Sequence, residues 1–386
     1  MENRISIYGH SGSYNHGNEA VVRGLCSIIS PLRPDLYCTS PYIDRVFGLD
    51  EVCNLIYEGD KNVSKIRVIG DKGITRILKS DKIRFSYRYK ALLENVNGIY
   101  LFTAEDQYCE PKRIIEWFEY ENREINRCGG KTIAVGATIN EDLIGTRIPL
   151  EDLCRYQLVI ARESITYDAL QKHGINSVLI PCTAFAMKEE KCDIPEDFEN
   201  IVGLNMGPLA QGNEVYNELY YQNCIELMRY ILTDTDFRIA LIPHMNWQDG
   251  ISDFDTHDWL FNMFKQTGRV FNLRERNAPQ QKYILGKCRM VVTTRTHVSV
   301  SSYAKAVPTL VTGYKQKSIG IARDIFGTSD NYVMPIQDLS AKRDFVRGFK
   351  WLADNEERIG NQLKEIMPAY ISRTETIKEE IKRVSF

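Results

Sequence analysis

Arg295 and His297 combine the two side-chain types that a site for anion binding and proton transfer requires. They follow the apolar run 289–292 (RMVV) and precede a helical pattern at 298–306, so they stand where a strand ends and a helix begins. The free amides of a helix start bind anions, and an imidazole exchanges protons near neutral pH. A purely structural histidine is the alternative. The position at a helix start favours function, with His297 as the general acid and base.

Two other cations follow predicted strands. Arg162 comes directly after the apolar run 157–161 (QLVIA), where it can pair with an anionic ligand or, alternatively, with Glu163 on the surface. Lys317 lies in a loop after a predicted strand at 307–311, which places it beside the loop of Arg295. A solvated loop is the alternative for Lys317.

The loop 9–20 (GHSGSYNHGNEA) follows a predicted strand and opens a helix, which Asn18 is expected to cap. Its glycines fit neither the dinucleotide-binding pattern nor the P-loop, so a tight turn is the alternative to a ligand loop. The density of polar residues favours a ligand loop that contains Asn15, Gly17, Asn18 and Glu19.

A second polar loop, 243–249 (PHMNWQD), follows the predicted strand at 238–242. Trp247 can stack on a sugar ring, while His244 and Asp249 can bind hydroxyl groups. A packed loop without a ligand is the alternative.

The elements that must position these loops alternate along the chain. Strands are expected at 4–8, 66–69, 99–102, 131–135, 157–161, 177–180, 201–204, 238–242, 289–292 and 307–311, with helical patterns between them. Residues 188–200 form a polar linker. This pattern predicts an α/β protein with two doubly wound, Rossmann-like domains, 1–187 and 201–386, that face a ligand cleft.

Taken together, the loops resemble the polysaccharide pyruvyl transferase family. The resemblance rests on the asparagine- and glycine-containing loop at 12–20, the strand followed by Arg-Glu-Ser at 159–164, the Arg-x-His at 295–297, and the Tyr-x-x-Lys-x-x-Gly at 314–320. It implies a glycosyltransferase B-like architecture and transfer of pyruvate from phosphoenolpyruvate to a sugar, which forms a cyclic ketal in capsular polysaccharide or exopolysaccharide biosynthesis.

By position in the family pattern, Arg162, Arg295 and Lys317 would bind phosphoenolpyruvate and His297 would be catalytic. The second domain would then hold the donor and the first would serve the acceptor glycan, which in this family is often linked to a lipid. No cofactor beyond the co-substrate phosphoenolpyruvate and no metal is expected, since the proposed chemistry needs only acid–base catalysis and charge.

Composition and charge limit the binding partners that are expected for the chain and its expected place in the cell. The formal net charge is −2, which gives no overall signature of a nucleic-acid-binding protein. Residues 61–90 nevertheless carry a net charge of +8 with interleaved aliphatic and aromatic residues, which favours a membrane-contacting patch over a solvated helix face. With no export signal and ten scattered cysteines, the chain is expected in the cytoplasm, in peripheral contact with the inner face of the cell membrane.

Two other functions fit the same residues. A glycosyltransferase of this architecture would use the cations to hold the diphosphate of a nucleotide sugar. A non-catalytic protein that binds anionic glycans would use them without turnover.

Overall fold

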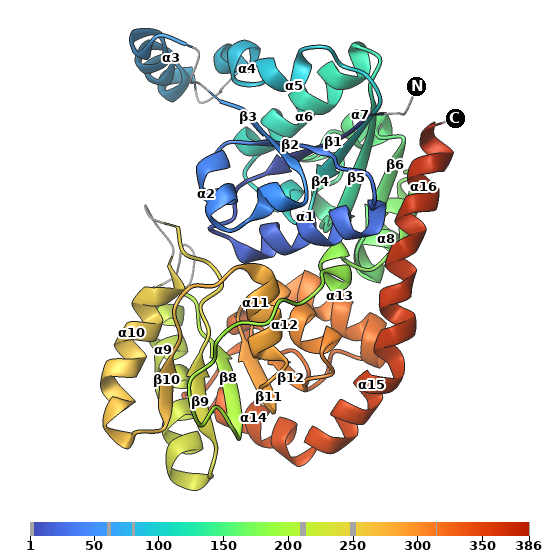
Figure 1. Cartoon of the computed structure of the whole chain (residues 1–386). Helices are drawn as coiled ribbons and strands as arrows, with labels where there is room; N and C mark the ends of the chain where they lie inside the picture. Colours follow the sequence, from blue (N-terminus) through green and yellow to red (C-terminus); the bar gives the residue numbers. More distant parts are fainter. Residues whose placement is uncertain are drawn as a thin grey trace. The chain divides into compact units, whose positions relative to one another are not determined.

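A computed structural model describes residues 4–59, 63–78, 82–208, 214–247, 252–313 and 315–385. The chain forms two compact units (Figure 1). The first unit contains residues 4–12, Val21–Thr183 and 373–385, and the second contains Ser13–Ala20 and Ala184–Ser372. Each unit is an α/β structure with its own sheet.

The first unit is built on a seven-stranded sheet in the order β3-β2-β1-β4-β5-β6-β7, and its strand pairs are parallel. The strands are β1 (Ile5–His10), β2 (Asp35–Cys38), β3 (Asn54–Tyr57), β4 (Ile99–Thr103), β5 (Lys131–Ala137), β6 (Leu158–Ala161) and β7 (Ser177–Leu179). The connecting helices are α1 (His16–Ile29), α2 (Pro41–Val46), α3 (Lys65–Leu78), α4 (Lys82–Arg88), α5 (Lys90–Leu93), α6 (Lys112–Arg127), α7 (Leu150–Arg155) and α8 (Ser164–Lys172).

The second unit has a five-stranded parallel sheet in the order β10-β9-β8-β11-β12. Its strands are β8 (Ile201–Asn205), β9 (Arg238–Leu241), β10 (Val270–Asn272), β11 (Met290–Thr293) and β12 (Thr309–Val311). Its helices are α9 (Glu214–Asp234), α10 (Asp253–Phe264), α11 (Ala278–Leu285), α12 (Thr296–Ala304), α13 (Lys315–Phe326), α14 (Asp344–Asp354) and α15 (Glu356–Ser372).

The central strands are buried on both faces, which is why they read as unbroken apolar runs. Every residue of β4 is buried, and the Phe102 ring packs 5.1 Å from the ring of Tyr8 on β1. At Gly9, with φ of +83°, a Cβ atom would come within 2.5 Å of the Phe102 ring. A residue without a side chain therefore lets β1 end close against β4.

Three segments fall in a different unit from the one the sequence predicts. Residues 13–20 and 184–187 group with the second unit, and residues 373–385 group with the first. The C-terminal helix α16 (Thr376–Ser385) is held in the first unit by bonds from lysine side chains to backbone carbonyls: Lys131 Nζ to Val384 at 2.7 Å and Lys378 Nζ to Ser30 at 2.9 Å. The regroupings of 13–20 and 373–385 rest on contacts between residues far apart in the chain.

Local structure also departs from prediction in four places. The strand predicted at 66–69 lies inside helix α3, because its β-branched residues belong to a longer helical pattern that includes Ile66, Ile69 and Ile77. The short strands β2, β3 and β10 were not predicted. Residues 188–200 contain neither helix nor strand, as expected for the predicted linker.

Candidate functional site

The strand–loop–helix unit around Arg295 and His297 is present in the second unit. Strand β11 ends at Thr293, Arg295 takes the position before the first helical residue, and His297 lies in the first turn of α12. The backbone amide of Thr294 donates to the carbonyl of Asn205 at 3.0 Å, which fixes the loop to β8. His297 is 9% exposed. The predicted placement of both residues is therefore confirmed.

Arg295 is held by a carboxylate that the sequence did not bring to attention. Its Nη2 lies 2.7 Å from Oδ1 of Asp253, the buried first residue of α10. The other carboxylate oxygen accepts from the backbone amides of His244 and Met245 at 2.9 and 3.0 Å, and from Nδ2 of Asn205 at 2.9 Å. Asp253 thus fixes the guanidinium and ties it to the ends of β8 and β9.

The loop 13–20 joins this site by backbone pairing. The amide of His16 donates to the carbonyl of His244 at 3.1 Å, and the amide of Asn246 donates to the carbonyl of Tyr14 at 2.9 Å. Helix α1 begins at His16, and the side chain of Asn15 accepts from the amide of Gly17 at 3.0 Å. Asn15 therefore caps the helix, and the predicted cap at Asn18 is wrong because the helix starts two residues earlier.

Gly17 is required by the approach of His297. A Cβ atom built on Gly17 would overlap Nδ1 of the His297 ring. The ring therefore packs directly against the backbone at the start of α1. The predicted loop residue and the predicted catalytic residue belong to one site.

His16 supplies a buried positive charge that the sequence reasoning missed. Its Nδ1 lies 2.8 Å from Glu19 and its Nε2 lies 3.3 Å from Glu275. Burial alone would lower the pKa of His16, but these two carboxylates outweigh burial and raise it to about 9. The imidazolium is therefore charged at neutral pH. The spacing of His16 and Glu19, one helical turn apart, is the sequence signal that could have indicated it.

Glu19 is itself fully buried and accepts a second bond, from the backbone amide of Ala278 at 3.0 Å. Its carboxylate therefore joins His16 to the start of α11. Asn18 is also buried. The contacts of Glu19 support a positioning role for this carboxylate.

His244 is buried beside His16, with ring centroids 6.0 Å apart, and remains neutral. Burial is the main cause that lowers the pKa of His244 to about 3, and the charge of His16 lowers it further. Gln281 donates through Nε2 to the carbonyl of Arg276, so its Oε1, 2.6 Å from Nδ1 of His244, is the acceptor. Nδ1 therefore carries the proton of His244, and Nε2, which has no hydrogen-bond partner among the described residues, is a free acceptor.

Three further residues of the second unit were predicted as site residues, and the structure describes two of them. Lys317 is half-buried in the first turn of α13, which follows β12, the sheet neighbour of β11. Trp247 is half-buried, with its ring 5.9 Å from that of Tyr14. Asp249 lies outside the described residues.

Arg162 belongs to the first unit, at the end of β6. It is 1% exposed, and its Nε donates to Oγ1 of Thr138 at 2.8 Å. Nη1 and Nη2 have no hydrogen-bond partner among the described residues. Glu163 instead caps α8 by accepting from the amide of Thr166, so the alternative of a surface pair between Arg162 and Glu163 is wrong. A buried guanidinium with two unused nitrogens is suited to an anionic ligand.

No cluster of three or more His, Cys, Asp or Glu side chains arranged to hold a metal ion occurs within the described ranges. The second-unit site contains Arg295 paired with Asp253, the charged His16 between Glu19 and Glu275, the neutral His244 and the imidazole of His297.

Solved structures with the same fold define the class of protein. The chain resembles a Listeria monocytogenes protein described as a UDP-N-acetylglucosamine 2-epimerase (TM-score 0.64, 12% identity, 99% and 98% of the two chains covered). It also resembles MnaA of S. aureus in complex with UDP (0.60, 14%, 99% and 96%) and HepE of Anabaena with UDP and glucose (0.55, 10%, 99% of each). The architecture is glycosyltransferase B-like, as predicted.

The family follows from the sequence match. The model of the polysaccharide pyruvyl transferase family matches residues 61–316, and the chain belongs to this family. No curated protein matches the chain.

The charge on His16 makes a stability prediction. Because its pKa rises from about 6.5 in the unfolded chain to about 9, its contribution is complete below about pH 6.5 and is lost as the pH rises through 9. The shift corresponds to about 3 kcal/mol. Urea unfolding of wild type and His16→Gln should therefore differ most near pH 6, and the difference should shrink toward pH 10. His173→Gln, at an exposed histidine, is the control. A difference that stays constant with pH would contradict the charge assignment.

Proposed function

We propose that this protein transfers pyruvate from phosphoenolpyruvate to a sugar and forms a cyclic ketal in the synthesis of a capsular polysaccharide or exopolysaccharide. Family membership gives the reaction class. The observation that carries the donor assignment is the arrangement, in one unit, of Arg295 and His297 at the start of α12 with Lys317 in the first turn of α13, after the neighbouring strand β12. Fixed cations and helix amides suit a substrate that carries both a carboxylate and a phosphate.

The chemistry requires proton transfer at a defined carbon. Protonation of C3 of phosphoenolpyruvate makes a methyl group and gives C2 oxocarbenium character, so a sugar hydroxyl can attack C2. The bond from C2 to the phosphate oxygen then breaks, and a second hydroxyl closes the ketal. Of the two hydroxyl protons, one balances the proton taken up by C3 and the other leaves with phosphate. His297 is the proposed general acid and base, and the cations stabilise the departing phosphate.

His16 and His244 have different proposed roles. Both ring nitrogens of His16 are engaged by carboxylates, so it holds Glu19 and Glu275 in place and is not a proton donor to substrate. His244 offers Nε2 as an acceptor that can receive a proton or a hydroxyl hydrogen bond. Arg162 is the anion-binding candidate of the first unit.

Turnover with candidate acceptors tests the function. Incubation with phosphoenolpyruvate and lipid-linked oligosaccharides should release inorganic phosphate and add the mass of a pyruvate ketal to the glycan. HepE and MnaA were solved with UDP, so a nucleotide-sugar glycosyltransferase is the competing function. Release of a nucleoside diphosphate from a sugar nucleotide, with phosphoenolpyruvate left intact, would favour that function. Binding of a glycan without turnover of either phosphoenolpyruvate or a sugar nucleotide would favour the non-catalytic alternative.

Lys317→Ala is expected to weaken phosphoenolpyruvate binding by roughly tenfold, the loss of one favourable charge contact. Its effect on the rate at saturating donor should be small, because lysine supplies charge and not protons. Initial-rate kinetics over a range of donor concentrations separate the two effects. Lys342→Ala, at an exposed lysine of the same unit, is the matched control. Equal donor affinity in Lys317→Ala and the control would contradict the role.

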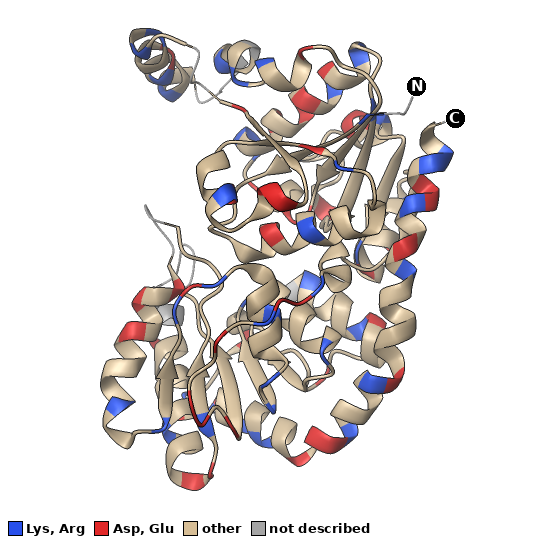
Figure 2. Ribbon diagram, in the orientation of Figure 1, with Lys and Arg blue, Asp and Glu red and all other residues tan. Residues whose placement is uncertain are grey.

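The basic segment of the first unit has a geometry suited to a membrane surface. Helix α3 buries Thr75, while Ile66, Ile69 and Ile77 are 85%, 69% and 81% exposed. At 100° per residue the three isoleucines lie on one side of the helix, flanked by Lys65, Lys72 and Arg76, all of them exposed. Figure 2 shows the basic residues along α3. Every helix within the described ranges is too short or too polar to span a membrane.

We propose that α3 lies on an anionic bilayer at the inner face of the cell membrane, with the isoleucines inserted at the headgroup boundary and the basic residues on the lipid phosphates. Such docking would bring the enzyme to a lipid-linked acceptor. A solvated helix face, which is the alternative, would not explain why three isoleucines of α3 are exposed.

Vesicle co-sedimentation tests the docking. Wild type should bind vesicles that contain phosphatidylglycerol, and high salt should weaken the binding. Charge reversal at Lys65, Lys72 and Arg76 together should weaken it by roughly 100-fold, at about 1 kcal/mol per basic residue. Ile66→Asp with Ile77→Asp should also release the protein. The control pair Leu32→Asp and Val46→Asp places the same change at exposed apolar residues elsewhere in the first unit. Absence of wild-type binding at low salt would refute the docking.

A further inference from the structure

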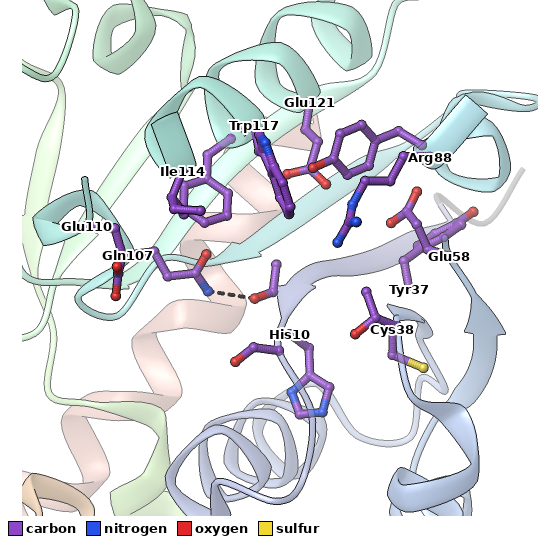
Figure 3. A pocket seen from close by; sticks show the side chains of 15 residues that line it. His10, Tyr37, Cys38, Glu58, Arg88, Gln107, Glu110, Ile114, Trp117 and Glu121 are labelled. Carbon is purple, nitrogen blue, oxygen red and sulfur yellow. Dashed lines mark hydrogen bonds between the residues drawn. The ribbon is translucent and has the colours of Figure 1, made fainter. Parts of the chain in front are cut away.

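A pocket lies entirely within the first unit, at the carboxyl ends of its strands. It has a volume of about 270 Å³. His10 ends β1, Cys38 ends β2, Glu58 directly follows β3, and helix α6 closes the opposite wall (Figure 3). The carboxyl edge of a parallel sheet is where α/β proteins bind ligands. The pocket uses none of the groups assigned above to the donor.

Two buried carboxyl groups line this pocket. Glu58 and Glu121 are 5% and 4% exposed, and Oε1 of Glu58 and Oε2 of Glu121 have no hydrogen-bond partner among the described residues. Burial raises the pKa of Glu58 to about 8 and that of Glu121 well above its usual range. Both groups are therefore largely protonated at neutral pH, and a carboxylic acid both donates and accepts hydrogen bonds. Buried polar atoms without partners are costly unless a ligand supplies the bonds.

The other polar groups of the pocket are held in place. The guanidinium of Arg88 lies 4.1 Å over the indole ring of Trp117, so that ring face positions Arg88. Gln107 donates through Nε2 to the carbonyls of Gly9 at 2.6 Å and Thr103 at 2.9 Å. Its Oε1 and the Nε of Arg88 have no hydrogen-bond partner among the described residues. In Figure 3, Arg88, Glu58 and Gln107 extend toward the same space.

The charges and the size define the class of ligand. Arg88 is the one lysine or arginine among the described residues that line the pocket. A molecule with both a carboxylate and a phosphate needs more than one cation, which separates this pocket from a phosphoenolpyruvate site. Arg88 and the protonated carboxyl groups disfavour a cation. A neutral molecule with several hydroxyl groups matches the alternating donors and acceptors, and the volume lies near the roughly 300 Å³ at which small-molecule sites begin.

We propose that this pocket binds one neutral hexose residue, with its hydroxyl groups hydrogen-bonded to Glu58, Glu121, Arg88 and Gln107. That the hexose belongs to the acceptor glycan rests on the proposed function; that the pocket binds a hexose does not. Ile114 on α6 lines the pocket and is half-buried, so a larger side chain there would narrow it.

Saturation-transfer NMR and calorimetry with the methyl pyranosides of glucose, galactose, mannose and N-acetylmannosamine test the binding. Glu121→Leu should weaken the binding of the preferred glycoside about tenfold, as expected for one or two lost hydrogen bonds. Glu121→Gln, which keeps an acceptor and a donor, should weaken it less. Ile114→Trp should abolish it, and Lys112→Trp, which places the same side chain at an exposed position of α6, should not.

The outcomes separate this proposal from the proposed function. Absence of wild-type binding to all four glycosides, or equal affinities in wild type and Ile114→Trp, would overturn the hexose pocket. Phosphoenolpyruvate turnover with an unchanged acceptor KM in Glu121→Leu and Ile114→Trp would overturn the assignment of this hexose to the acceptor glycan, while the proposed function stands. Hexoside binding that these variants lose, in a protein that never consumes phosphoenolpyruvate, would uphold the pocket and reject the function.

Discussion

His297→Ala is expected to fold normally and to lose most of the turnover of phosphoenolpyruvate. Loss of a general acid and base lowers the rate by roughly 10²–10⁴-fold. The ring lies at the start of α12 and packs against the backbone of Gly17, so its removal leaves Arg295 held by Asp253 and leaves Lys317 in the first turn of α13. Phosphoenolpyruvate should therefore still bind. Single-turnover phosphate release, together with donor titration, measures the two effects separately.

The matched control for this variant is His173→Ala, because His173 is an exposed histidine at the end of α8. It should retain wild-type turnover. Far-UV circular dichroism and the unfolding midpoint establish that His297→Ala is folded. A folded His297→Ala with a rate within a few fold of wild type would remove His297 from the mechanism.

Asp253→Ala is expected to destabilise the protein by about 3–5 kcal/mol, the usual cost of breaking a buried ion pair from one side. The change leaves the guanidinium of Arg295 without its carboxylate. It also deprives the amides of His244 and Met245 and the side chain of Asn205 of their acceptor. Urea unfolding at pH 7 measures the loss. Asp258→Ala removes from the same helix a half-buried carboxylate that pairs with Arg274 and accepts from Asn272, and it should cost about 0–1 kcal/mol.

Acid should narrow the difference between wild type and Asp253→Ala. Burial alone would raise the pKa of Asp253, but the charge of Arg295 and its hydrogen bonds outweigh burial and lower it to about 2. With an unfolded pKa of about 3.9, the stabilisation is complete above about pH 4 and is lost as the pH falls toward 2. Equal stability of Asp253→Ala and Asp258→Ala at pH 7 would show that the buried pair contributes little.

Much of the candidate site was predictable because its signals are local. An apolar run followed by Arg295, His297 and a helical pattern identifies a strand, a loop and a helix within about twenty residues, and the structure has these elements in that order. The same reasoning failed at 66–69, where three β-branched residues and one arginine predicted a strand. Only the longer spacing of Ile66, Ile69 and Ile77 shows that this segment is a helix with an exposed apolar side.

The sequence by itself determined the two-part α/β architecture, the family, and the placement of Arg162, Arg295, His297 and Lys317 in the segments that follow strands. Hydrophobic periodicity and motif spacing are properties of neighbouring residues. The tertiary structure alone decided the charges of the site. Asp253 binds Arg295, which is 42 positions away in the sequence, and Glu275 binds His16, which is 259 positions away. Those pairings depend on the order of the strands in the sheet and on burial, which together fix the protonation of each histidine and which no local pattern encodes.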